Sequence, residues 1–128
     1  MEREDKIKVL LIEDEKEVLD LYRLKLNLDG YNVLAAESGQ AGLDLAFREL
    51  PEIIFLDLKM PEMDGFEVLK RLRENPKTKD TPILILTNFD EEELVEKGLT
   101  LGANEYLVKS TFTPGEISKK VEKWVGED

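Results

Sequence analysis

Short apolar runs alternate with segments of helical periodicity along this chain. Unbroken apolar runs of this length are typical of strands that are buried on both faces of a parallel sheet. Runs of this kind predict strands at residues 7–12, 31–36, 52–57, 82–87 and 105–109. The run at 31–36 is more polar than the others, which indicates an edge strand.

The intervals between these strands carry the start and stop signals of helices. Ser38 and Asp90 stand where helix N-caps are expected, and Gly30 and Gly102 stand where helices end. A capping box with proline at the first helical position opens the last helix. The predicted helices cover residues 15–29, 38–50, 64–74, 90–101 and 113 onward.

Strands that alternate with helices in this way predict an α/β doubly wound fold, a five-stranded parallel sheet with five helices on its two faces. The length of 128 residues favours a single domain over residues 1–128. Of the common doubly wound orders, 2-1-3-4-5 places the first strand beside the third, where the winding reverses. The residues that follow these two strands are therefore expected to lie close together.

The composition excludes several kinds of chemistry. The chain has no cysteine and no histidine, which excludes disulfides, thiol catalysis and zinc sites built on these residues. The net charge of −11 predicts no direct binding to nucleic acid. No apolar run has the length of a signal peptide core or a membrane span, so no membrane insertion and a cytoplasmic location are predicted.

Four of the strands stop at polar residues that are suited to phosphate chemistry. Glu13 and Asp14 follow the first strand, while Asp57, Thr87 and Lys109 end the third, fourth and fifth. Neighbouring carboxylates raise each other's pKa unless a cation lies between them, and oxygen ligands without cysteine or histidine favour Mg²⁺. A carboxylate can also accept a phosphoryl group, with a lysine and a hydroxyl to neutralise its charge.

These residues, with the segments 60–65 and 102–109, carry a resemblance to a known family. The chain resembles the receiver domain of the response regulators of two-component signalling, and is similar to the single-domain chemotaxis type over nearly its whole length. The resemblance implies a flavodoxin-like fold and a phosphoprotein of a phosphorelay. Such a protein catalyses only its own phosphotransfer and dephosphorylation, and is not an enzyme that turns over a metabolite.

The resemblance also implies roles for individual residues. Asp57 would be the phospho-acceptor, and Lys109 would bind the phosphoryl group. Asp14, Asp57 and the backbone carbonyl of Lys59 would bind Mg²⁺, with help from Glu13. The phosphoryl group would come from a sensor histidine kinase or a histidine phosphotransfer protein.

The output side is implied in the same way. Thr87 and Tyr106 would form the switch pair, which changes the affinity for a downstream protein at the face of the fourth helix, fifth strand and fifth helix. Lys59, Asn88 and Phe89 would form the rim of the phosphoryl site, where Lys59 and Phe89 are expected to shield the acyl phosphate. We expect a monomer or a weak dimer.

Two positions depart from the family pattern. Ser110 stands where a proline with a cis bond is usual. A cis bond before serine costs about 2.5–4 kcal/mol, so the alternative is a trans bond with a reshaped loop. Asn88 stands where a small residue is usual, and its side chain can crowd the path of Tyr106 or the entrance to the site.

The first predicted helix carries two adjacent apolar stripes, Val18, Leu21, Leu24 and Leu28, and Leu19, Tyr22 and Leu26. One interpretation is that they fill the core and pack on the last helix. The other is that part of the second stripe docks onto kinase helices.

Three alternatives to a working receiver remain open. A phosphatase with an aspartate nucleophile would have a second aspartate at the position of Lys59. A nucleotide- or flavin-binding module would have a glycine-rich loop after the first strand, where this chain has acidic residues. A pseudo-receiver would keep the fold as an interaction module without phosphorylation.

Overall fold

The computed structural model describes residues 5–126. It contains a five-stranded sheet in the order β2-β1-β3-β4-β5, with all neighbouring strands parallel, which confirms the predicted fold and strand order. The strands are β1 (Lys8–Ile12), β2 (Asn32–Ala36), β3 (Ile53–Leu56), β4 (Ile83–Thr87) and β5 (Glu105–Val108). The helices are α1 (Lys16–Leu28), α2 (Gly39–Glu49), α3 (Gly65–Glu74), α4 (Glu92–Thr100) and α5 (Pro114–Val125), with a short 3₁₀ helix at Lys109–Thr111.

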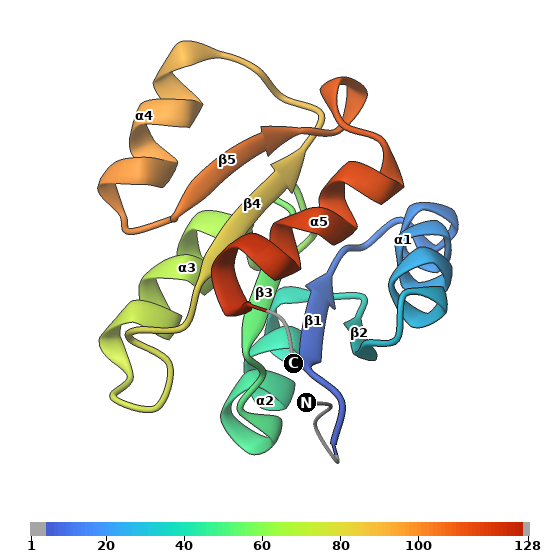
Figure 1. The fold of residues 1–128 in the computed structure, drawn as a ribbon. Helices are drawn as coiled ribbons and strands as arrows, with labels where there is room; N and C mark the ends of the chain where they lie inside the picture. Colours follow the sequence, from blue (N-terminus) through green and yellow to red (C-terminus); the bar gives the residue numbers. More distant parts are fainter. Residues whose placement is uncertain (1–4, 127–128) are drawn as a thin grey trace.

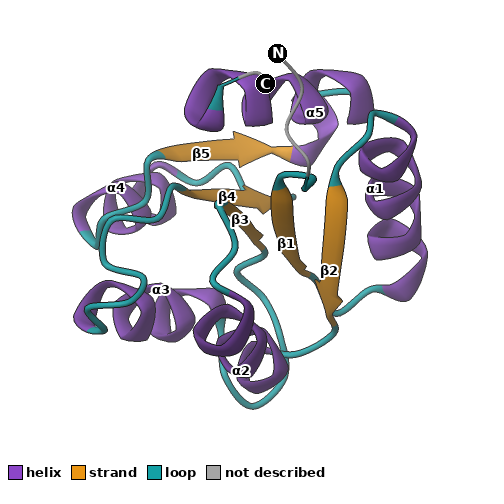
Figure 2. Cartoon of the chain, turned by 60° about the horizontal axis from the view of Figure 1, so that its bottom comes forward, coloured by secondary structure: helices purple, strands orange, loops and turns teal. Residues whose placement is uncertain are grey.

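Helices cover both faces of the sheet (Figures 1 and 2). Helices α1 and α5 lie on one face, where the alternate strand residues Val9, Leu11, Ile53 and Phe55 form a core with them. Helices α2 and α3 cover the other face and pack on the intervening strand residues, among them Leu10, Ile12, Ile54 and Leu56. Burial on both faces explains why the central strands are unbroken apolar runs.

The register of the sheet brings the strand ends together. Ile12 of β1 pairs with Leu56 of β3, so the residues that follow them start from adjacent positions at the same edge. The backbone N–H of Asp57 donates to the carbonyl of Ile12 at 3.0 Å, which extends this pairing into the loop. Thr87 pairs with Val108, so Lys109 leaves β5 at the same edge.

Most of the predicted helix ends are confirmed. Ser38 accepts a hydrogen bond from the N–H of Ala41 at 3.1 Å, and Thr113 and Glu116 form the predicted capping box. Gly30 and Gly102 have φ of +94° and +110°, values that favour glycine at the end of a helix.

The prediction that Asp90 caps the fourth helix is wrong. The N-cap of α4 is Glu91, and its side chain makes no capping hydrogen bond. The backbone of the preceding Phe89 is held by the Tyr106 hydroxyl, which donates to its carbonyl at 2.7 Å. This contact links the segment just before α4 to β5.

The two stripes of α1 have opposite environments. Leu19, Tyr22 and Leu26 are buried in the core, so the hypothesis that this stripe docks onto kinase helices is wrong. In the first stripe, Leu21 and Leu24 are 53% and 59% exposed, so the interpretation that both stripes fill the core is wrong as well. Leu21 and Leu24 face solvent because the opposite side of α1 packs on the sheet and on α5.

Helix α4 is attached to the sheet by a small contact. Gly98 is its buried residue, and a Cβ added there would lie 2.5 Å from Cδ1 of Ile85 and 3.3 Å from the ring of Tyr106. The glycine thus allows the helix backbone to approach β4 and β5 closely, but it contributes no side chain to the core.

Arg73 of α3 joins three segments at the opposite end of the sheet from the polar strand ends. Its guanidinium donates to the carbonyls of Gly102, Thr78, Lys79 and Thr81 at 2.7–3.2 Å, and to the Asn104 side chain at 2.9 Å. Burial lowers its pKa, but a guanidinium remains charged at neutral pH. Among residues 5–126, no helix has the length and apolar character needed to span a bilayer.

Candidate functional site

Three carboxylates meet at the edge where β1 and β3 end. Glu13, Asp14 and Asp57 each offer an oxygen, and these oxygens all lie within 4.8 Å of one another. Glu13 and Asp57 are buried, each only 6% exposed, while Asp14 is half-buried. The structure therefore brings together the acidic residues that the strand ends predicted.

The side chain of Asp57 has a fixed orientation. Its Oδ1 accepts a hydrogen bond from the N–H of Leu58 at 2.8 Å, while its Oδ2 lies 3.5 Å from Nζ of Lys109. The backbone of Gly65 packs directly against that of Asp57, since a Cβ added at Gly65 would lie 2.2 Å from the carbonyl oxygen of Asp57. The close approach of the two backbones requires glycine at this position.

Lys109 lies between two of the carboxylates, with its side chain 9% exposed. Its Nζ donates to Oε1 of Glu13 and forms the longer ion pair with Asp57. Burial by itself would lower the pKa of Lys109, but the hydrogen bond to Glu13 and the charge of Asp57 raise it above its usual value. Lys109 is therefore a fixed positive charge at neutral pH.

Glu13 is held from both sides. Its Oε1 accepts from Lys109 and its Oε2 accepts from the N–H of Glu15 at 3.0 Å. Burial raises the pKa of Glu13 to about 7, with a further contribution from the nearby charge of Asp57, while the two hydrogen bonds act in the opposite direction. A cation at this edge would favour the ionised form of the cluster.

The peptide bond between Lys109 and Ser110 is trans, since residues 5–126 contain no cis peptide bond. The chain continues from Lys109 into the 3₁₀ helix up to Thr111. Of the two alternatives left open by the sequence, the trans bond is the one observed, and Lys109 reaches the acidic cluster.

Thr87 and Tyr106 are connected through one backbone segment. Thr87 is fully buried, and its Oγ1 accepts a long hydrogen bond, 3.4 Å, from the N–H of Phe89. The Tyr106 hydroxyl donates to the carbonyl of the same residue. Burial, together with the charges of nearby acidic residues, raises the pKa of Tyr106 to about 12, so its hydroxyl stays protonated and remains a donor.

The predicted rim residues lie on two loops. The Nζ of Lys59 lies 5.2 Å from the centroid of the Phe89 ring, a distance suited to a cation–π contact. Lys59 and Asn88 are exposed, and Phe89 is half-buried. The contact joins the loop after β3 to the loop after β4.

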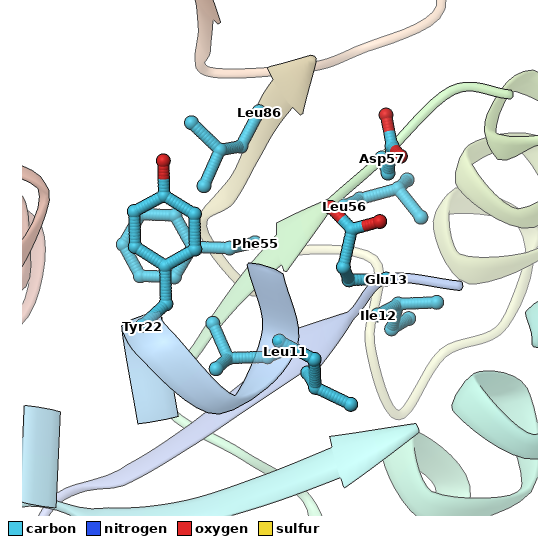
Figure 3. Close-up of a pocket in the computed structure, with 9 residues that line it drawn as sticks. Leu11, Ile12, Glu13, Tyr22, Phe55, Leu56, Asp57 and Leu86 are labelled. Atoms are coloured by element: carbon cyan, nitrogen blue, oxygen red, sulfur yellow. The ribbon is translucent and has the colours of Figure 1, made fainter. Parts of the chain in front are cut away.

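A small cavity lies beneath the acidic cluster (Figure 3). Glu13 and Asp57 line one side, and Tyr22 of α1 lines the other among leucine, isoleucine and phenylalanine side chains. The sequence placed Tyr22 only on an apolar stripe. Its hydroxyl was the one signal that it differed from the leucines beside it.

The donor set fits a hard divalent cation. Mg²⁺ is usually held by one or two carboxylates together with water and phosphate oxygens, and the cluster offers three carboxylates and neither sulfur nor imidazole. The carboxylates of Asp14, Asp57 and Glu13 would hold the ion.

Comparisons with known proteins identify the family of the chain. The family of response regulator receiver domains matches residues 9–122, so the chain belongs to this family. It is therefore a receiver domain of the two-component response regulators, a class of signalling modules that interact with histidine kinases and downstream effectors.

Similar proteins were found both among curated sequences and among solved structures. The chain is 40% identical over 114 residues to the alkaline phosphatase synthesis transcriptional regulatory protein PhoP of Bacillus subtilis, which covers 89% of this chain and 46% of PhoP. Among solved structures, the chemotaxis protein CheY4 of Vibrio cholerae has a TM-score of 0.86 and 33% identity, with 93% of this chain and 98% of CheY4 covered. The receiver domain of the Francisella response regulator 1452 has a TM-score of 0.83 and 31% identity, with 91% and 94% covered. The chain spans about half the length of curated relatives such as PhoP.

Proposed function

We propose that this receiver accepts a phosphoryl group on Asp57 from the phosphohistidine of a sensor histidine kinase or a histidine phosphotransfer protein, in a step that requires Mg²⁺. The observation that carries the proposal is the arrangement around Asp57. One carboxylate oxygen is tied to the Leu58 N–H, and the other faces the Lys109 ammonium beside two further carboxylates.

In this step the Asp57 carboxylate attacks phosphorus. The new bond joins an Asp57 oxygen to phosphorus, the bond between phosphorus and the donor's imidazole nitrogen breaks, and that nitrogen keeps the electron pair. Lys109 neutralises charge on the phosphoryl oxygens, and the buried Thr87 hydroxyl can donate to one of them. Asp14, Asp57 and Glu13, with the backbone carbonyl of Lys59, would hold Mg²⁺, which when bound would supply the remaining positive charge.

The proposed switch follows from the contacts of Thr87 and Tyr106. A phosphoryl group adds about two negative charges and three acceptor oxygens. If Thr87 turns toward it, the hydrogen bond from the Phe89 N–H is lost, and the segment that holds Tyr106 is released. The change would alter the surface of α4, β5 and α5, which we propose as the binding site for a downstream protein.

The test is a mass measurement on the intact chain. Incubation with acetyl phosphate and Mg²⁺ should add one phosphoryl group, located on Asp57 by borohydride reduction and peptide mapping. Asp57→Asn and omission of Mg²⁺ should each abolish the gain. A pseudo-receiver would show no gain under any of these conditions, and a phosphatase would hydrolyse small phosphoesters catalytically, so either result would contradict the proposal.

A further inference from the structure

A cation–π contact joins α4 to the start of α3. The ammonium nitrogen of Lys97, on α4, lies 4.4 Å from the centroid of the Phe66 ring, which is close enough for an attraction between the charge and the ring. It is the shortest of the four contacts of this kind within residues 5–126. Phe66 is half-buried and packs against the core on the side of α2 and α3, so the core holds its ring.

A groove separates α3 from α4 around this contact. It has a volume of about 270 Å³ and runs between the two helices, which lie side by side in Figure 2. The groove is lined by Asp64, Phe66, Glu67, Lys70, Lys97 and Leu101. The Lys97 ammonium makes no hydrogen bond and no ion pair with the part of the chain that the structure describes, so the Phe66 ring is its partner across the groove.

The start of α3 is also joined to the phospho-acceptor loop. The N–H of Gly65 donates to the carbonyl of Leu58 at 2.8 Å, and the backbone of Gly65 packs against that of Asp57. Phe66 is the next residue, in the first turn of α3. A shift of the backbone at Asp57 and Leu58 is therefore carried to the Phe66 ring.

The position of Lys97 on α4 matters as much as its partner. It directly precedes Gly98, the buried residue at which α4 approaches the sheet, beside Ile85 and the ring of Tyr106. Two connections to the phosphoryl site therefore meet on adjacent residues of α4, one through Tyr106 and the other through Phe66.

We propose that the contact between Lys97 and Phe66 links the phospho-acceptor Asp57 to α4 and holds α4 in its unphosphorylated position. The link acts beside the proposed switch pair, Thr87 and Tyr106. A phosphoryl group that shifts the backbone of Asp57 moves the first turn of α3 with it, so the ring leaves its place under the ammonium and α4 is released. This response rests on the proposed function, whereas the restraint of α4 in the unphosphorylated chain does not.

The first test measures amide hydrogen exchange in the unphosphorylated chain. Lys97→Met removes the charge and keeps the length of the side chain, so exchange in α4 should become about two- to five-fold faster, as for the loss of an exposed cation–π contact. Lys70→Met, which removes another exposed lysine of the groove, should leave α4 at its wild-type rate.

A double-variant comparison separates the contact from a general effect of charge. Lys97 stands in the last turn of α4, where a positive charge also interacts favourably with the helix dipole. In a Phe66→Leu background, Lys97→Met should therefore accelerate exchange less than it does in the wild-type chain. An equal acceleration in both backgrounds, or none in either, would overturn the inference.

The second test follows the response of α4 to beryllofluoride and Mg²⁺, which mimic a phosphoryl group on Asp57. Tyr106→Phe removes the hydroxyl that bonds to the Phe89 carbonyl and should reduce the change in α4 exchange without abolishing it. Tyr106→Phe combined with Lys97→Met should abolish the change.

The two ways of failing are distinguishable. A response that Tyr106→Phe alone abolishes, or one that survives in the combined variant, would overturn the link while leaving the proposed function intact. A wild-type chain that gained no phosphoryl group from acetyl phosphate would overturn the proposed function and the response together, and the first test would still decide whether Lys97 restrains α4.

Discussion

Glu105, at the start of β5, offers a stability test whose size follows from its contacts. Its Oε1 accepts from Lys120 at 2.8 Å, and its Oε2 accepts from Lys123 at 2.9 Å and from the indole N–H of Trp124 at 2.6 Å. Burial alone would raise the pKa of Glu105, but these three hydrogen bonds outweigh it and lower the pKa to about 2. The carboxylate thus joins β5 to α5.

Replacing Glu105 by glutamine removes the charge and keeps the shape. A pKa of about 2 in place of 4.5 corresponds to about 3.5 kcal/mol in favour of the ionised form, at about 1.4 kcal/mol per pH unit. Lys123 is 57% exposed, so solvent screening reduces this figure, and we expect Glu105→Gln to lower the free energy of unfolding by about 1–2 kcal/mol at pH 7.

The pH dependence has a definite sign. Because the folded-state pKa lies below the unfolded-state value, the stabilisation is complete above about pH 5 and is lost as the pH falls from 4.5 toward 2. The difference between wild type and Glu105→Gln should therefore shrink by about half by pH 3. Urea unfolding measures it, with Trp124 as the probe, since the chain has a single tryptophan.

The matched control is Glu67→Gln on α3. Glu67 also accepts from a basic side chain, Arg71, at 2.9 Å, but this pair is exposed and should contribute only a few tenths of a kcal/mol. If Glu105→Gln destabilised the chain no more than Glu67→Gln, or by an amount that did not change with pH, the reasoning would be refuted.

Three further predictions concern the site and its support. Lys59→Asn and Phe89→Glu should each accelerate phosphate loss from phosphorylated Asp57 about two- to five-fold, since each removes the cation–π contact above it; an unchanged decay, followed by mass spectrometry, would contradict shielding. Gly65→Ala should destabilise the fold by about 1–3 kcal/mol and slow phosphorylation, because the new Cβ would displace the Asp57 backbone; a wild-type urea midpoint would contradict this. Arg73→Lys should lower the free energy of unfolding by about 1–3 kcal/mol, since an ammonium cannot reach all the acceptors of a guanidinium. An unaltered urea midpoint would show that these hydrogen bonds are not needed.

Features set by local rules could be predicted from the sequence. Crossover handedness narrows the strand orders to a few, and the order 2-1-3-4-5, taken from known doubly wound folds, is confirmed. The capping of α5 by Thr113 depends on a four-residue motif and was also predicted correctly. The meeting of Glu13, Asp14 and Asp57 follows from parallel strands that end at one edge.

Features that depend on contacts between distant segments could not be predicted. The periodicity of α1 shows two apolar stripes but not which one faces the sheet, because a helix position alone does not reveal what packs on it. The Arg73 guanidinium donates to backbone carbonyls of a loop, and these acceptors leave no signal in the sequence. The bond from Tyr106 to the Phe89 carbonyl, just before the N-cap Glu91 of α4, could not be predicted either, because backbone acceptors of this kind are not visible in a sequence.

The glycine contact of α4 has a consequence for how far a signal can travel. A helix anchored by Gly98, with no large side chain in the core, can slide or fray without opening a hole in the hydrophobic interior. The rearrangement that we propose at Tyr106, whose ring lies beside that glycine, would therefore meet little resistance in α4, whereas α3 is held in the core by Val68, Leu69 and Leu72. Amide hydrogen exchange should be fastest in α4 among the five helices. This helix would then be the one that most readily changes position against the sheet.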